Sequence, residues 1–174
     1  MVLPLTVCLL NTLIKRVISF IKTVFMKILL ISMTILFSIY SNAQSNDLVK
    51  AEGEARENQK LILLSFSGSD WCIPCIRLEK EIFENDEFKN YAAQHLILMR
   101  ADFPRLKKHQ LPKIEKKKND VLAEKYNKQG AFPYTVLLDS NGKVLKQWDG
   151  IPASAANEFI KQLHSLADAA YRSN

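Results

Sequence analysis

The stretch Leu61-Ile-Leu-Leu-Ser-Phe-Ser-Gly-Ser-Asp-Trp-Cys-Ile-Pro-Cys75 decides the fold class. Its first six residues, Leu61–Phe66, form a nearly continuous apolar run, which is typical of a strand buried on both faces of a sheet. Ser67–Asp70 then turns the chain, and apolar residues recur at roughly helical spacing from Cys72 onward. The sequence therefore predicts a central strand that leads into a helix, with two cysteines at the junction.

The rest of the chain alternates between strand and helix patterns. We expect, in chain order, a helix within Asp47–Asn58, a helix around Glu87–Gln94, a second buried strand at His95–Ala101, a basic irregular segment leading into a helix with Leu122 and Tyr126, strands at Tyr134–Asp139 and Lys143–Trp148, and a C-terminal helix after Pro152. Asn141-Gly142 is a strong signal for an antiparallel hairpin between the last two strands. This order predicts an α/β fold, with helices on both faces of a central mixed sheet.

Residues 1–43 have the features of a leader, and 44–174 those of a folded domain. Within the leader, Met26–Ala43 combines a lysine, thirteen largely apolar residues and a small-residue cleavage site, which predicts a secretory signal peptide and a start of translation at Met26. Thirteen residues are too few to span about 30 Å of hydrocarbon, which favours cleavage and an exported, periplasmic protein. The alternative is an uncleaved anchor, Val17–Tyr40, in the inner membrane, and only this alternative implies membrane contact.

Most of the chain's net charge of +6 lies in the leader. The leader holds four of the 24 Lys and Arg residues and no acid, so residues 44–174 carry 20 cations against 18 acids. This balance argues against nucleic acid as the default partner.

The pair Cys72 and Cys75 has the spacing of a reactive dithiol. A thiol attacks as its thiolate, and the first turn of a helix stabilises that anion at Cys72. Cys75 lies one turn further, within reach of a mixed disulfide on Cys72, and Pro74 falls in the first turn, where its missing N–H costs nothing.

Two other interpretations of the cysteines remain open. An inert disulfide would close a loop of four residues and add little stability. A metal site needs about four ligands, and residues 44–174 offer no further cysteine and only the histidines His95, His109 and His164. We therefore expect no metal and no bound cofactor.

The sequence resembles the thioredoxin family over about Leu61–Leu166. The resemblance is based on the buried strand, Trp71–Cys75, the following helix, and Phe132-Pro133 before another strand. It implies a thioredoxin-like fold in which the proline facing the cysteines, Pro133, is cis and the backbone at Phe132 pairs with substrate. It also implies that substrate contacts Trp71, Ile73 and Pro74 around the sulfurs.

Within this family, Gly68–Cys72 and Leu78–Phe88 are most similar to secreted proteins related to the C-terminal domain of periplasmic disulfide-interchange reductases. In that group an acid four residues after the second cysteine lies beneath the active site, which gives Glu79 a role in proton transfer; a solvated helix residue is the alternative. The buried aspartate of cytosolic thioredoxins corresponds to Ser65 here.

Several other residues have simpler interpretations. We expect Asp70 to cap the active-site helix and Trp148 to pack in the core. The basic run Arg105–Lys118 is interpreted as a solvated loop, with docking of an acidic partner or an anionic membrane as the alternative.

These observations lead to one functional hypothesis and two alternatives. The hypothesis is an exported thiol–disulfide oxidoreductase of the protein-disulfide reductase type, which acts on protein thiols and disulfides, receives electrons from an upstream thiol reductant and contributes to redox homeostasis. The alternatives are a non-catalytic module that binds extended peptides by strand addition and a membrane-anchored electron-relay subunit.

Overall fold

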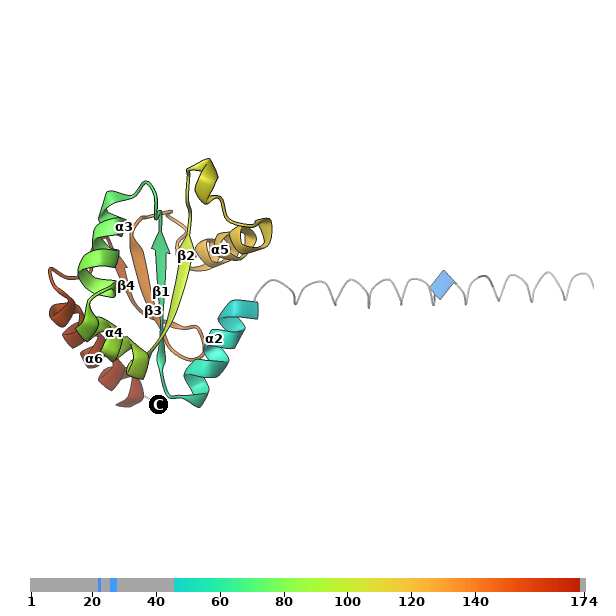
Figure 1. Cartoon of the computed structure of the whole chain (residues 1–174). Helices are drawn as coiled ribbons and strands as arrows, with labels where there is room; N and C mark the ends of the chain where they lie inside the picture. Colours follow the sequence, from blue (N-terminus) through green and yellow to red (C-terminus); the bar gives the residue numbers. More distant parts are fainter. Residues whose placement is uncertain (1–21, 23–25, 28–45, 173–174) are drawn as a thin grey trace, which may run out of the picture. The chain divides into compact units, whose positions relative to one another are not determined.

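The computed structural model of the protein describes residues 22, 26, 27 and 46–172 (Figure 1). The contacts along the chain divide it into two units, Met1–Ala43 and Gln44–Asn174. The predicted signal peptide and the alternative anchor lie largely outside the described residues. Among the residues that are described, no helix is long and apolar enough to cross a membrane.

The sheet has four strands in the order β2-β1-β3-β4. Their bounds are β1 Leu61–Ser67, β2 Leu96–Asp102, β3 Tyr134–Leu138 and β4 Val144–Asp149. The β1–β2 pair is parallel, and the β1–β3 and β3–β4 pairs are antiparallel. The predicted mixed sheet and its C-terminal hairpin are thereby confirmed.

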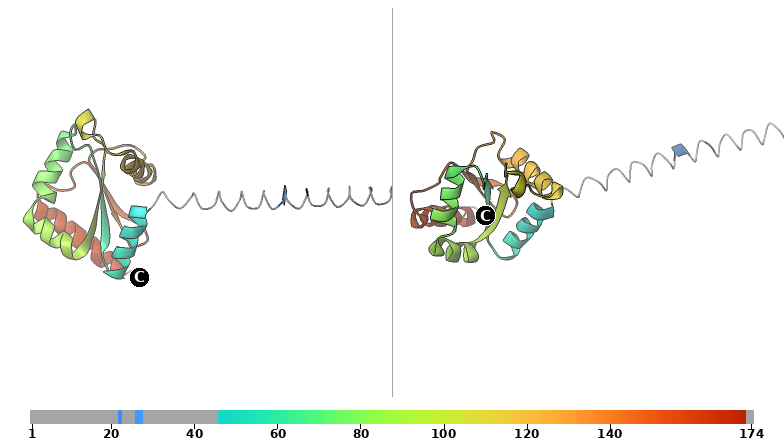
Figure 2. Two further views of the ribbon diagram at one scale, coloured as in Figure 1. Left: turned by 45° about the vertical axis from the view of Figure 1, so that its right-hand side comes forward. Right: turned by 45° about the horizontal axis from the view of Figure 1, so that its top comes forward.

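Helices cover both faces of this sheet (Figures 1 and 2). Their bounds are α2 Asn46–Glu57, α3 Ile73–Leu78, α4 Asp86–His95, α5 Lys113–Tyr126 and α6 Ala156–Arg172, with the short π-helical segment η2 Glu79–Phe83 and the 3₁₀ turn η3 Lys107–His109. Helices α2 and α5 bury Leu48 and Leu122 on one face. On the other face, α3, α4 and α6 bury Leu78, Phe88 and Phe159. The predicted α/β layers are confirmed.

Strand β1 is buried at all seven positions, as its apolar run predicts. The prediction that the second apolar run is also buried is wrong, because β2 is an edge strand that, among the described residues, pairs only with β1. Leu98 is 56% exposed and Arg100 is exposed as well. Both residues line a cavity of about 260 Å³ at this edge, together with Ser65 of β1 and Glu79.

The hairpin turn is longer than Asn141-Gly142 alone. Leu138 pairs with Val144, so residues 139–143 form the connection. One carboxylate oxygen of Asp139 accepts hydrogen bonds from the backbone N–H groups of Asn141 (2.8 Å) and Lys143 (2.9 Å). Of the turn residues, only Gly142 has a positive φ, at 74°. The aspartate therefore stabilises the wider turn by satisfying backbone amides.

Candidate active site

The cysteines lie where the chain leaves β1 and enters α3. The Cys72 N–H donates to the carbonyl oxygen of Gly68 (2.9 Å), which closes the turn before the helix. Cys72 is the N-cap residue of α3, and its Sγ accepts a hydrogen bond from the Cys75 N–H (3.2 Å). Pro74 stands in the first turn, as predicted. The two cysteines form a disulfide, with 5.2 Å between their Cα atoms.

Exposure does not distinguish the two cysteines in this disulfide form. Cys72 is 4% exposed and Cys75 is 3% exposed. The residues between them are exposed, and Ile73 reaches 71%. The asymmetry between the cysteines comes instead from the amide hydrogen bond, because an N–H aimed at Cys72 Sγ favours negative charge on that sulfur.

The peptide bond between Phe132 and Pro133 is cis, as the family resemblance implies. The Pro133 carbonyl oxygen accepts a hydrogen bond from Gly150 N–H (2.9 Å). Within residues 46–172, the N–H and C=O groups of Phe132 form no hydrogen bond. This backbone is therefore available to an extended chain that approaches the loop.

Trp71 lies against the loop that follows β2. Its indole N–H donates to the carbonyl oxygen of Phe103 (2.8 Å), and its ring meets the ring of Phe132 edge-on at 5.5 Å. A Cβ atom at Gly68 would stand 2.3 Å from the indole, so only glycine fits below this ring. The guanidinium of Arg105 covers the indole at 3.6 Å from the ring centroid. Trp71 is therefore half-buried. Trp148, in contrast, packs in the core against Phe159, and this prediction is confirmed.

The prediction that Asp70 caps the active-site helix is wrong. The Asp70 carboxylate instead accepts hydrogen bonds from the backbone N–H groups of Arg105 and Leu106, both at 2.9 Å, and contacts His109 Nδ1 at 3.1 Å. Burial opposes the charge, but these donors lower the pKa of Asp70 below its usual value. The N-cap position belongs to Cys72, which leaves Asp70 to hold the loop after β2.

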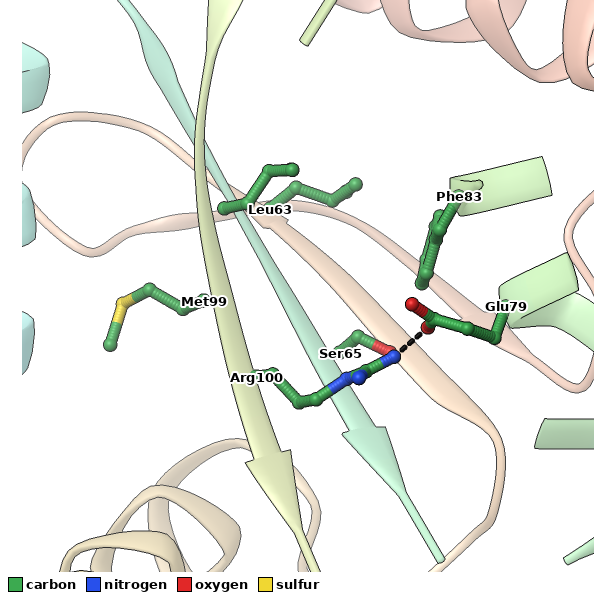
Figure 3. Close-up of a pocket in the computed structure, with 7 residues that line it drawn as sticks. Leu63, Ser65, Glu79, Phe83, Met99 and Arg100 are labelled. Carbon is green, nitrogen blue, oxygen red and sulfur yellow. Dashed lines mark ion pairs between the residues drawn. The ribbon is translucent and has the colours of Figure 1, made fainter. Parts of the chain in front are cut away.

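Glu79 forms an ion pair with Arg100, whose side chain extends from β2 toward the helical segment (Figure 3). The Glu79 side chain is 30% exposed, so it is neither fully buried nor freely solvated. Glu79 and Arg100 also line a cavity of about 180 Å³ that reaches Cys75. The predicted acid thus shares a cavity with the second cysteine, but it is paired with a cation that no sequence pattern indicated.

Ser65 and its paired neighbours form a polar row across β2, β1 and β3. Arg100 pairs with Ser65 in the β1–β2 register, and Ser65 pairs with Thr135 in the β1–β3 register. Thr135 is fully buried, and its hydroxyl has no hydrogen-bond partner among the described residues. Arg100 and Thr135 were not predicted from the sequence, because only the strand register places them beside Ser65.

The three histidines lie apart from one another in different environments. His109 contacts Asp70, His95 packs against Tyr91 with 4.7 Å between ring centroids, and His164 Nδ1 lies 3.3 Å from a carboxylate oxygen of Asp168. In the described part of the chain, no group of three or more His, Cys, Asp and Glu side chains is arranged to hold a metal ion.

Comparison with known proteins places this site in a family. The model of the thioredoxin-like domain matches residues 48–167. The chain is 36% identical to the disulfide bond reductase DsbH of Chlamydia pneumoniae over 126 residues, which are 72% of this chain and 74% of that protein. The structure of a DsbH oxidoreductase is similar, with 31% identity and a TM-score of 0.62, covering 68% of this chain and 79% of that one.

A further solved structure shows the same fold at lower identity. It is a disulphide isomerase from Xylella fastidiosa Temecula1, with 21% identity, a TM-score of 0.52 and coverage of 70% of this chain and 92% of that one. The Cys72–Cys75 disulfide after β1 and the cis peptide bond before Pro133 agree with these matches. The chain belongs to the thioredoxin-like family and is one of its thiol–disulfide oxidoreductases.

Proposed function

We propose that the protein is exported and reduces disulfides in other proteins, with Cys72 as the attacking sulfur. The observation that carries the proposal is the hydrogen bond from Cys75 N–H to Cys72 Sγ at the start of α3. This amide stabilises a thiolate on Cys72, and a thiolate is the form that attacks a disulfide. Identity to a protein named as a disulfide bond reductase supports the same direction of electron flow.

The reaction runs in two exchanges. The Cys72 thiolate attacks one sulfur of the client disulfide, so that a mixed disulfide forms and the other client sulfur leaves as a thiolate. Cys75 then loses its proton and attacks Cys72 Sγ, which releases the second client thiol and closes the Cys72–Cys75 disulfide. The dithiol gives up two electrons in this cycle, and an external thiol reductant returns them by the reverse exchanges.

The surroundings of the cysteines support a role in holding an extended client. Phe132 offers an unpaired N–H and C=O next to Pro133, which suits backbone pairing by strand addition. Ile73 and Pro74 are exposed between the two cysteines, and the half-buried Trp71 directly precedes Cys72. We assign client contact to these five residues.

Glu79 is assigned to the second exchange. It shares a cavity with Cys75, and a carboxylate in that position accepts the proton that Cys75 must lose before it attacks. The adjacent Arg100 forms an ion pair with this carboxylate and orients it, so we assign Arg100 as a positioning residue.

A variant that stops after the first exchange tests the proposal. With insulin as the disulfide substrate, Cys75→Ser should accumulate a mixed disulfide between Cys72 and an insulin chain, visible by mass spectrometry and released by dithiothreitol. The matched control, Cys72→Ser, should form much less of this adduct. Equal adduct in both variants would refute the assignment of Cys72. If Cys75→Ser forms no adduct and the wild type does not reduce insulin, a peptide-binding module would be favoured.

Export is tested separately. We expect the protein recovered from outside the cytoplasm to begin at Gln44, which the mass of its N-terminal peptide would show. A mature N-terminus upstream of Val17 would contradict cleavage and favour the membrane-anchored form.

A further inference from the structure

A groove of about 270 Å³ lies beside the active site, between the turn before the cysteines and the loop after β2. Trp71, Phe103 and Phe132 give it an aromatic side, and Phe132 meets both other rings edge-on at 5.4 and 5.5 Å. Trp71 directly precedes Cys72, and Phe132 directly precedes Pro133. A client chain whose disulfide meets Cys72 therefore passes next to this groove.

The other side of the groove belongs to a strongly basic segment. Residues 103–118 contain seven Lys and Arg residues and one acid, Glu115. Arg105 and Lys116 line the groove itself. Lys116 is paired with Asp120 at 2.7 Å, so its charge is largely balanced within the protein.

The carboxylates near the groove are already bound by donors of the protein. Asp102 accepts from the N–H and the hydroxyl of Ser69, and Asp70 accepts from the two loop amides described above. These donors are neutral, so both carboxylates keep their charge, but with Glu115 they are three acids against the seven cations of residues 103–118. The net charge that faces a client from this side is therefore positive.

Arg105 is linked to the active site through Trp71, the residue directly before Cys72. Its guanidinium lies over the indole at 3.6 Å, and within the described residues it forms no ion pair. Stacking fixes the plane of the guanidinium and leaves its N–H edge for a ligand, and this planar edge matches both oxygens of a carboxylate. The side chain is exposed, so a client can reach it.

We propose that this groove selects protein disulfides with acidic residues beside the reacting cysteine, and that Arg105 binds a client carboxylate. The inference rests on the proposed reductase function and names the class of client that the same site prefers. An acidic peptide segment fits better than an anionic membrane, because the cation is seated on an aromatic groove next to the redox site. A single carboxylate side chain of the client is enough to bind Arg105.

Two synthetic peptides with the same intramolecular disulfide test the inference. One carries Asp and Glu residues beside its cysteines, and the other carries Asn and Gln at the same positions. The measurement is kcat/KM for reduction of each peptide by the full protein under a constant supply of thiol reductant. For the wild type, we expect a preference for the acidic peptide of roughly two- to fivefold, which corresponds to one partly exposed ion pair.

Variants then assign the preference to its source. Arg105→Gln should bring the ratio of the two kcat/KM values close to one, and Arg105→Lys should retain part of the preference because it keeps the charge but not the planar edge. Both substitutions keep the backbone N–H that binds Asp70. The matched control is Lys161→Gln, which removes one exposed cation from α6 on the other face of the sheet and should leave both rates unchanged.

The outcomes separate this inference from the proposed function. The wild-type preference should decrease as the salt concentration rises, because salt screens an exposed ion pair. Reduction of both peptides at equal rates, or a preference that Arg105→Gln does not change, would overturn the acidic-client inference and leave the reductase function standing. Reduction of neither peptide would overturn both. Equal rates together with cosedimentation on phosphatidylserine vesicles would assign the basic segment to a membrane surface instead.

Discussion

Glu79 on the helical segment behind the cysteines forms an ion pair with Arg100 on the edge strand, and the two residues line the cavity that reaches Cys75. Ser65 stands between them on the central strand and lines a cavity with both (Figure 3). The carboxylate that shares a cavity with Cys75 is thus supplied by the helical segment η2 and not by β1.

Replacement of Glu79 by Gln should slow the second exchange and spare the first. The amide cannot accept the Cys75 proton, so the mixed disulfide should persist, and its decay should be slower by about tenfold or more. Rapid acid quench of a single turnover, followed by mass spectrometry, measures formation and decay separately. The matched control is Glu81→Gln, two residues away, where the acid is paired with Arg77. Equal decay rates in the two variants would return Glu79 to the role of a solvated helix residue.

Replacement of Arg100 by Gln tests the positioning role. Without the guanidinium, the Glu79 carboxylate loses the ion pair that orients it beside the cavity reaching Cys75, so decay of the mixed disulfide should slow while its formation is unchanged. The rates of formation and decay in a single turnover are the measurement, and Arg100→Lys should restore most of the wild-type decay rate. Equal slowing of formation and decay would point to a purely structural role for Arg100.

The contact of Asp70 with the loop should depend on pH in a defined direction. Its pKa is lowered from 3.8 in the folded protein, so its contribution to stability is complete above about that value and is lost as the pH falls further through the folded pKa. Amide hydrogen exchange at Arg105 and Leu106 should therefore show protection at pH 5 that Asp70→Asn reduces. Ser69→Ala, which removes a hydroxyl donor from the neighbouring Asp102, is the control. Unchanged protection in Asp70→Asn would contradict the assignment.

Gly68 and Gly53 provide a matched pair for the packing of Trp71. A Cβ at Gly68 would meet the indole at 2.3 to 2.6 Å, so Gly68→Ala should displace the ring and lower the free energy of unfolding by about 1–3 kcal/mol. Gly53 lies within α2 with no atom within 4 Å of an added Cβ, and Gly53→Ala should raise the same free energy by about 0.5–1 kcal/mol. Urea denaturation, followed by tryptophan fluorescence, compares the two. A Gly68→Ala protein as stable as the wild type would show that the indole moves without cost.

The reduction potential should lie in the reducing half of the range between about −270 and about −120 mV that related dithiol proteins cover. Ile73 occupies the position of glycine in the Gly-Pro pair of cytosolic thioredoxins, and residues between the cysteines tune the stability of the thiolate. Equilibration with a glutathione buffer measures the potential, and Ile73→Gly isolates the effect of this side chain. A potential near the oxidising end would reverse the proposed direction of electron flow and leave the assignment of the two cysteines intact.

Local patterns predicted most of this fold, because the strand leading to Cys72, the helices and the hairpin depend on neighbouring residues. The prediction that β2 is buried was wrong, because an apolar run has the same pattern in a central strand and in a partly covered edge strand. The role of Asp70 was also mistaken. An aspartate before a helix has the pattern of a cap, but here a cysteine sulfur accepts the helix amide and the aspartate turns to a loop 35 residues away in sequence.

The active site was predictable to the extent that it is local. The cysteine pair, Pro74 and the acid at Glu79 follow from short-range spacing and family resemblance. Arg100 was not predictable, because its position depends on the parallel register that sets it opposite Ser65. The stacking of Arg105 on Trp71 likewise requires the path of the loop, which no pattern in the basic run specifies.

The attachment of the loop to Asp70 separates the shape of the loop from its side chains. Asp70 binds the main-chain N–H groups of residues 105 and 106, and every amino acid except proline supplies that group. Evolution can therefore replace Arg105 or Leu106 and alter what the loop recognises without releasing the loop from the scaffold. Asp70 has no such freedom, because its two carboxylate oxygens serve two different amides. Descendants of this protein are expected to differ in clients sooner than in the geometry that presents them to the sulfurs.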